Sequence, residues 1–136
     1  MPQNALAQIH ELLAAKRYSV TESSDSGLRI LEVDSGLAMQ AELQGEILFF
    51  SLVCATVPAA RITPPLMHKM LDAQNGISTS HFQLSSLPNG QTAITLNNFC
   101  KLQELGPDDE DDILSCVSFL LADVMQARNL LAADLQ

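Results

Sequence analysis

Helical spacing of hydrophobic residues marks the beginning of the chain. Leu6, Ile9 and Leu13 recur every three or four residues, with mainly polar or small residues between them. Asn4 stands where its side chain can cap the first turn, and basic Lys16 suits the negative end of the helix dipole. The pattern predicts a helix from Asn4 to Lys16.

Alternation of hydrophobic and polar residues follows this helix. Short polar turns, each containing a glycine, separate four runs at residues 18–21, 28–33, 37–44 and 47–54. The third run alternates strictly, which predicts a strand with one wet and one dry face. The fourth, ILFFSLVC, is apolar on both faces, as a central strand would be. Connections this short predict an antiparallel meander.

A helix and a hairpin are predicted next. Thr63 can cap a helix whose first turn holds two prolines, where a missing N–H is harmless, and Asn75-Gly76 can end it. Residues 77–84 and 92–97 have the composition of strands. They flank Pro88-Asn89-Gly90, which is a strong hairpin signal.

The last predicted helix, Ile113–Leu131, is the longest and has an unusually wide apolar face. Its main stripe consists of Ile113, Val117, Leu120, Val124, Ala127 and Leu131, and it is widened by Cys116, Phe119, Leu121, Met125 and Leu130. With no repeat and no linker, the order of elements predicts one α+β domain over residues 1–136: helix, antiparallel meander, helix, β-hairpin and long C-terminal helix.

Five consecutive acidic residues precede this helix in the run GPDDEDDI at residues 106–113. A calcium loop of the EF-hand type needs ligands at alternating positions, a central glycine and a distal glutamate, and this run supplies none of that order. Carboxylates are favourable at a helix N-terminus, and Asp108 after Pro107 is the predicted cap. The run is predicted to open the helix; the alternative is a contact patch for a basic partner.

Composition narrows the class of function. The 136 residues are 47% hydrophobic and carry a formal net charge of −9, so the chain is predicted to fold, and nucleic-acid binding is disfavoured. Three cysteines inside apolar segments argue against a disulfide framework. No apolar run approaches the roughly 20 residues that span a bilayer, and the N-terminus lacks the pattern of a signal peptide. A cytoplasmic protein that does not insert into membranes is expected.

Candidate chemistry is sparse. His10, His68 and His81 lie in different predicted elements without metal-ligand spacing, so no metal site or other cofactor is expected. Cys100 and His81 could form a nucleophile–base pair, but no motif supports one, and buried thiols with apolar neighbours keep a high pKa. A small enzyme or ligand-binding domain with a cleft around His81 and Cys100 stays the alternative.

The wide apolar face instead suggests protein binding. Such a face must be buried against the chain's own sheet, a second copy or a partner segment, and flexible methionines suit grooves that accept varied partners. The residues expected to be either core or contact are Phe49, Leu52, Met70, Phe119 and Met125.

The predicted order of elements resembles type III secretion chaperones of the Tir-chaperone class and their bacterial relatives of the YbjN type. The segments that carry the resemblance are ILFFSLV, ITPPLMHKMLDAQN, AITLNNF and DDEDDI leading to FLLADVM. An uncharacterised bacterial family of the same topology is the other possibility. The resemblance implies a small acidic dimer without a catalytic site. This chain has four predicted strands before the middle helix where the chaperones have three.

The sequence therefore predicts a non-enzymatic protein-binding module, a small chaperone-like or stress-regulatory adaptor of a bacterial cytoplasm. We expect a homodimer whose protein partner is basic or amphipathic.

Overall fold

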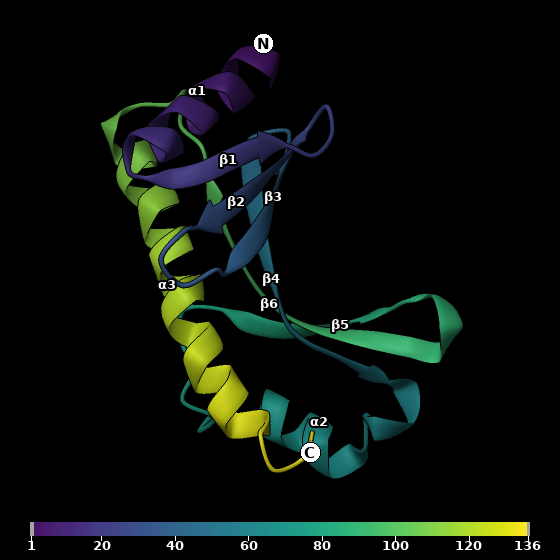
Figure 1. The fold of residues 1–136 in the computed structure, drawn as a ribbon. Helices are drawn as coiled ribbons and strands as arrows, with labels where there is room; N and C mark the ends of the chain where they lie inside the picture. The colour runs from purple at the N-terminus through teal and green to yellow at the C-terminus, as the bar shows by residue number, and fades with distance from the viewer. Residues whose placement is uncertain (1, 136) are drawn as a thin grey trace. The chain divides into compact units, whose positions relative to one another are not determined.

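The predicted α+β class is confirmed by the computed structural model, which describes residues 2–135 (Figure 1). Six antiparallel strands form one sheet in the order β1-β2-β3-β4-β6-β5. The strands are β1 (Tyr18–Glu22), β2 (Gly27–Glu32), β3 (Ala38–Gln44), β4 (Ile47–Pro58), β5 (His81–Ser86) and β6 (Gln91–Lys101). The helices are α1 (Pro2–Ala15), α2 (Pro64–Leu71) and α3 (Pro107–Leu131), with short 3-10 turns at Ala59–Arg61 and Pro88–Gly90.

Packing divides the chain into two compact units, each made of two separate segments. Unit 1 consists of residues 1–51 and 98–118, and unit 2 consists of residues 52–97 and 119–136. Strands β4 and β6 and helix α3 contribute residues to both units. The expectation of one domain over residues 1–136 stays a prediction.

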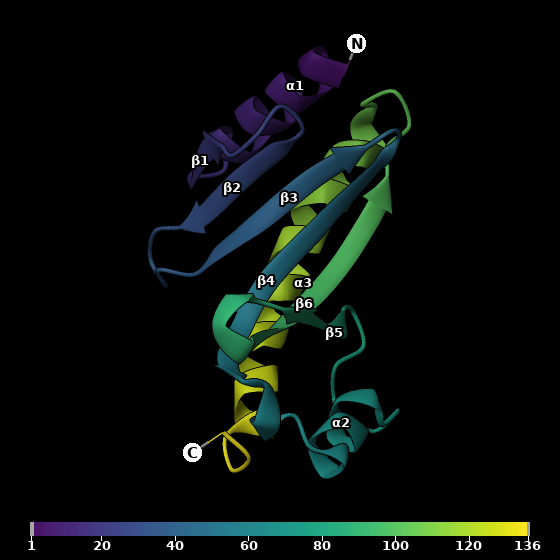
Figure 2. The same ribbon diagram turned by 90° about the vertical axis from the view of Figure 1, so that its right-hand side faces the viewer.

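Unit 1 contains the predicted meander. Strands β1, β2 and β3 pair in sequence and continue onto β4, as Figure 2 shows for β2 to β4. Because directly opposed residues share a face, the register Leu28↔Ala41 and Ala41↔Phe50 builds one continuous apolar row. All three side chains are buried, as are Ile9 and Leu13 of α1. Apart from Phe50, the side chains named here are aliphatic.

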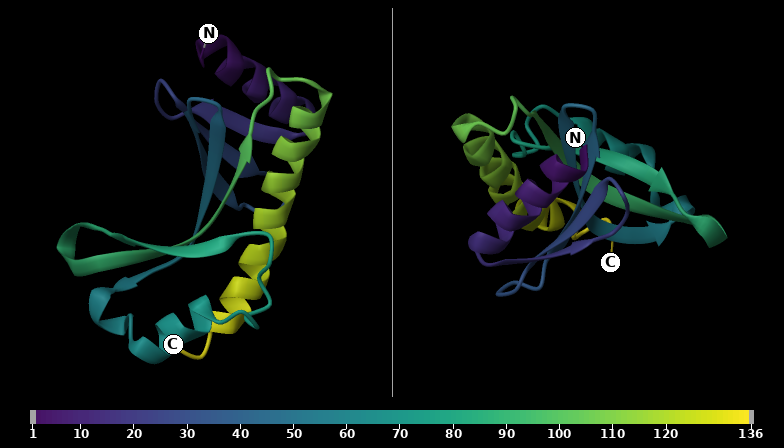
Figure 3. Two further views of the ribbon diagram at one scale, coloured as in Figure 1. Left: turned by 180° about the vertical axis from the view of Figure 1, so that it is seen from behind. Right: turned by 90° about the horizontal axis from the view of Figure 1, so that it is seen from above.

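Unit 2 contains the β5–β6 hairpin, α2 and the second half of α3 (Figure 3). The hairpin turns through Asn89 and Gly90, which have φ angles of 64° and 72°. Glycine adopts this left-handed region without strain and asparagine tolerates it, so Pro88-Asn89-Gly90 was a sound turn signal. Leu84 pairs with Ile94 across the hairpin.

Helix α3 begins at Pro107, six residues earlier than predicted, and the acidic run forms its first two turns. The predicted cap was wrong: Asp108 is already helical. The carboxylate of Asp109 closes this end of the helix instead, since its Oδ2 accepts hydrogen bonds from the backbone N–H groups of Gln103 at 2.7 Å and Gly106 at 3.2 Å. Asp109 is 1% exposed. The acidic run therefore opens the helix, as expected.

The main apolar stripe of α3 is confirmed, because every one of its six predicted members is buried. By length and composition alone α3 could also cross a bilayer, a test that core helices of soluble proteins pass as well. The periodic burial of the stripe is what a helix packed on a sheet shows. That the protein does not insert into membranes stays a prediction.

Other boundaries also differ from the sequence-based prediction, and strands β4 and β6 each continue four residues further than predicted, to Pro58 and Lys101. Helix α1 already includes Pro2, so Asn4 is not its cap. Helix α2 ends at Leu71, where Asp72 becomes extended, rather than at Asn75-Gly76. Strand β5 begins at His81 rather than Ile77. Side-chain contacts bend residues 77–80 away from a strand: Asn75 Oδ1 accepts the N–H of Ile77 at 2.9 Å, and Thr79 and Ser80 both donate to Asp123.

Candidate functional site

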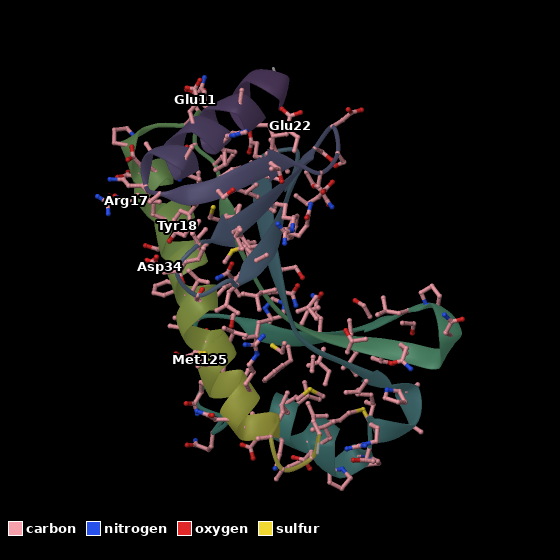
Figure 4. All side chains as sticks on the ribbon, viewed as in Figure 1. Glu11, Arg17, Tyr18, Glu22, Asp34 and Met125 are labelled. Atoms are coloured by element: carbon pink, nitrogen blue, oxygen red, sulfur yellow. The ribbon has the colours of Figure 1, made fainter. Side chains whose placement is uncertain are left out.

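The five residues proposed as core or contact separate into two groups. Leu52 and Met70 are buried, with 1% and 5% of their surface exposed. Phe49, Phe119 and Met125 are exposed, and Figure 4 labels Met125 on the second half of α3. Because both flanks of the α3 stripe keep apolar side chains in contact with water, its face is only partly covered by the described residues.

A concave apolar surface lies between α2 and β5 in unit 2. Met67, Met70, Leu71, Phe82, Gln83 and Leu84 line a pocket of about 250 Å³, which we call the α2–β5 pocket. Leu71 is 80% exposed and Leu84 is 42% exposed, so two of its apolar walls are open to solvent. Gln83 contributes the only polar side chain of the lining.

Helix α2 forms one wall because its ends are fixed locally. Thr63 caps the helix as predicted, its hydroxyl oxygen accepting from the N–H of Leu66 at 3.4 Å. Lys69 Nζ lies 2.6 Å from Asp134 Oδ2, and Arg61 donates to the Asp134 carbonyl oxygen at 3.1 Å. These contacts hold α2 against the last residues of the chain, all within unit 2.

Strand β5 forms the other wall of the pocket and is an edge strand of the sheet, beside β6. Thr79 and Ser80, just before it, donate to the Asp123 carboxylate of α3 at 2.6 and 2.8 Å, which positions the start of the strand. Every β5 residue except Phe82 is exposed. An edge strand presents unpaired backbone N–H and C=O groups that can pair with an added strand. The α2–β5 pocket therefore borders the edge strand of the sheet.

A second apolar surface lies in unit 1, on β4 and β6. The rings of Phe49 and Phe99 pack with their centroids 6.0 Å apart and their planes tilted by 44°. They are 38% and 58% exposed. A tilted aromatic pair left in water is typical of a surface that another molecule covers.

Sequence reasoning missed Leu71, Leu84 and Phe99. Leu71 is the last residue of α2 and is 80% exposed, although the sequence places the end of this helix at Asn75-Gly76. The signal for Phe99 was present: it shares a strand face with the polar residues Asn97 and Lys101, whereas Asn98 and Cys100 on the other face are buried. Leu84 gave no signal, because its exposure depends on β5 being an edge strand.

The alternative site around His81 and Cys100 receives no geometric support. His81 is exposed and lies 3.3 Å from the side-chain nitrogen of Gln83, while Cys100 is buried. The two residues belong to different units, and neither lines the α2–β5 pocket or the two further pockets at the α1–α3 and α1–β1 ends of unit 1.

The histidines are likewise dispersed. His68 is exposed and lies 3.7 Å from Asp72, one helical turn away. Within residues 2–135, no group of three histidine, cysteine or acidic side chains is placed to hold a metal ion.

All three thiols are free and buried, but they differ chemically. Burial raises the pKa of Cys54 to about 11, as expected for an isolated buried thiol. Cys116 departs from that expectation: the S–H of Cys100 donates to it and lowers its pKa, against the opposing effects of burial and of Asp112. The same contact, together with burial, raises the pKa of Cys100.

Comparison with known proteins bears on the fold. No protein-family model matches the chain. No curated protein matches it either. Among solved structures, the chain is similar to YbjN from E. coli, described as a candidate transcription regulator, with a TM-score of 0.65 and 16% sequence identity. The match covers 91% of this chain and 90% of that one. The chain therefore has a YbjN-type fold, as the resemblance implied; the likeness carries nothing about secretion chaperones.

Proposed function

We propose that this protein is a non-enzymatic protein-binding module, a small chaperone-like or stress-regulatory adaptor that acts as a homodimer in a bacterial cytoplasm. The likeness to YbjN supports the fold on which such a module would be built and is compatible with a regulatory adaptor. The observation that carries the proposal is the α2–β5 pocket, an apolar hollow beside an edge strand.

The proposed partner is an extended segment with apolar side chains and a net positive charge. Its backbone would pair with β5, and alternate side chains would enter the pocket between Met67, Met70 and Leu84. The methionines can adjust to side chains of different shape. The formal net charge of −9 would speed the encounter with a basic partner and oppose binding of nucleic acid.

The test is a pull-down from the native host with tagged wild-type protein and two matched variants. Leu84→Glu places a charge in the pocket, whereas Leu87→Glu places one on a side chain that does not line it. Leu87 is exposed to the same degree, 40% against 42%. We expect a partner that co-purifies with the wild type and with Leu87→Glu and is lost with Leu84→Glu.

A purified fragment of that partner should then bind with at least tenfold lower affinity to Leu84→Glu than to Leu87→Glu. Loss of binding in both variants would show that an added negative charge weakens binding whatever its position. Binding retained in both variants would show that the partner binds outside the α2–β5 pocket. Elution of the protein as a monomer, with no co-purifying protein, would contradict the adaptor proposal.

A further inference from the structure

Two cysteines of unit 1 meet between β6 and α3. Cys100 lies on β6 and Cys116 on α3, and each is 8% exposed. Asn98 precedes Cys100 by two residues on the same face of β6, and its side-chain amide donates to the backbone carbonyl of Cys116 at 3.0 Å. This bond holds the two segments together where the thiols lie, and the Cys100 S–H reaches the Cys116 sulfur.

The pair has the division of roles that a reactive dithiol needs. Cys116 accepts the hydrogen bond, which favours its thiolate, the nucleophilic form of cysteine. Cys100 keeps its proton and stands next to it as a second thiol. Cys54 is also 8% exposed but takes no part in this pair, so it provides a control of equal exposure within the same molecule.

We propose that Cys100 and Cys116 form a peroxide-sensitive dithiol that closes to an intramolecular disulfide and is reopened by thiol reductants. This modification would link β6 to α3 covalently, and it is independent of the proposed function. It is compatible with the cytoplasmic location expected from the sequence, because a disulfide in that reducing compartment is transient.

The chemistry balances with a hydroperoxide as the oxidant. The Cys116 thiolate attacks the OH oxygen of the peroxide, the O–O bond breaks, and Cys116 becomes a sulfenic acid. The hydroxide or alkoxide that leaves takes up a proton, equal to the one Cys116 released on ionising, and departs as water or an alcohol. The Cys100 sulfur then attacks the Cys116 sulfur and forms the S–S bond. The sulfenic oxygen leaves as water with the proton of Cys100. The two thiols lose two electrons and two protons, and the peroxide is reduced.

Closure requires the two sulfurs to approach to about 2.0 Å, the length of a disulfide bond. Reopening proceeds by thiol–disulfide exchange with a dithiol reductant.

The experiment treats the full chain with stoichiometric hydrogen peroxide, blocks the remaining thiols with N-ethylmaleimide under denaturing conditions, and measures intact mass and tryptic peptides. The disulfide removes two hydrogens, so a loss of about 2 Da is expected before blocking. The number of thiols that N-ethylmaleimide blocks should fall from three to one, and that one should be Cys54. A peptide joining Cys100 to Cys116 should appear, and dithiothreitol should restore all three thiols.

Single substitutions separate the roles of the two sulfurs. Cys54→Ser should leave the cross-link unchanged. Cys100→Ser should stop the reaction at a Cys116 sulfenic acid that dimedone traps, whereas Cys116→Ser should leave Cys100 unlabelled. Because the cross-link is read from the unsubstituted protein, the test does not depend on the folding of any variant.

Three results would overturn the proposal. They are oxidation of Cys54 as fast as of the pair, a gain of oxygen without a Cys100–Cys116 peptide, and a cross-link formed only between two chains.

Discussion

At the scale of single residues, Asp109 differs from the acidic residues around it in burial and in hydrogen bonding. It belongs to a run of five acids that look alike in the sequence, yet it alone is 1% exposed and accepts two backbone N–H groups. Its four acidic neighbours in the run are exposed, and three of the five acids lie in the first helical turn. The run therefore contains one structural carboxylate and four solvated ones.

We expect Asp109→Ala to destabilise the protein by about 1–3 kcal/mol, because two partly buried backbone N–H groups lose the carboxylate that accepts from them. Asp108→Ala should cost only about 0.3–1 kcal/mol, the contribution of an exposed acid at a helix N-terminus. Urea unfolding followed by circular dichroism measures both. Equal effects of the two substitutions would contradict the special role of Asp109.

Cys54 provides a pH prediction at the same scale. Because burial raises its pKa to about 11, the thiolate is rare at neutral pH and its fraction grows about tenfold per pH unit until that value. In a Cys100→Ser/Cys116→Ser variant, the rate of Cys54 alkylation by iodoacetamide should therefore still be rising at pH 10. A plateau near pH 9 would show an ordinary, solvated thiol.

The sign of the effect on stability follows from the same shift. The unfolded thiol ionises near pH 9 and the folded one only near pH 11. The contribution of Cys54 to stability is thus fully present below pH 9 and is lost as the pH rises to 11.

At the scale of elements, adjacent residues of α3 differ strongly in how much of their surface is exposed. Leu120 is fully buried, whereas Phe119 next to it is 43% exposed although it is larger and equally apolar. Helical periodicity explains the difference, because neighbouring residues point about 100° apart around the axis.

Leu120→Ala should lower the free energy of unfolding by about 2–5 kcal/mol, since it opens a cavity in the core. Phe119→Gln should change it by less than about 1 kcal/mol, as is usual for surface substitutions. The comparison is made by thermal and urea unfolding of the two variants side by side. A loss above 2 kcal/mol for Phe119→Gln would show that this ring is covered by an interaction that the single chain does not make.

The same scale shows what could be read from the sequence. All six strands, all three helices and the six-residue stripe of α3 were predicted, because period-2 and period-3.6 patterns report burial directly. The ends of elements were less accurate where a distant side chain decides them. The hydrogen bonds of Thr79 and Ser80 to Asp123 keep residues 77–80 out of strand β5. At the start of α3, the carboxylate that accepts backbone N–H groups is Asp109 rather than Asp108.

The candidate site was predictable only in part, for a related reason. Met70 was recognised as an apolar residue of interest, but Leu84 became a candidate only once β5 was known to be the edge strand, and Leu71 only once the end of α2 was known. Strand order depends on pairings between segments far apart in the chain, and those leave no local pattern.

At the scale of the whole molecule, association is expected to bury the Phe49–Phe99 pair of unit 1. A homodimer related by two-fold symmetry would place this patch against its own copy. Light scattering after size exclusion should therefore give the mass of two chains for the wild type and of one chain for Phe99→Ser. Val33→Ser is the matched control, since Val33 is 64% exposed and lies in the same unit. A dimer in both variants would place the interface elsewhere.

Each compact unit is assembled from stretches that are not neighbours in the chain. During synthesis, residues 1–51 emerge from the ribosome before residues 98–118, with which they pack. Residues 52–97 likewise emerge before residues 119–136, which complete the second unit. A nascent chain that has reached residue 97 therefore still exposes apolar side chains of both units, whereas a domain that folds from continuous sequence can already bury its core at that stage. Each unit thus depends on a segment that is made late, and the incomplete chain is exposed to aggregation in the meantime.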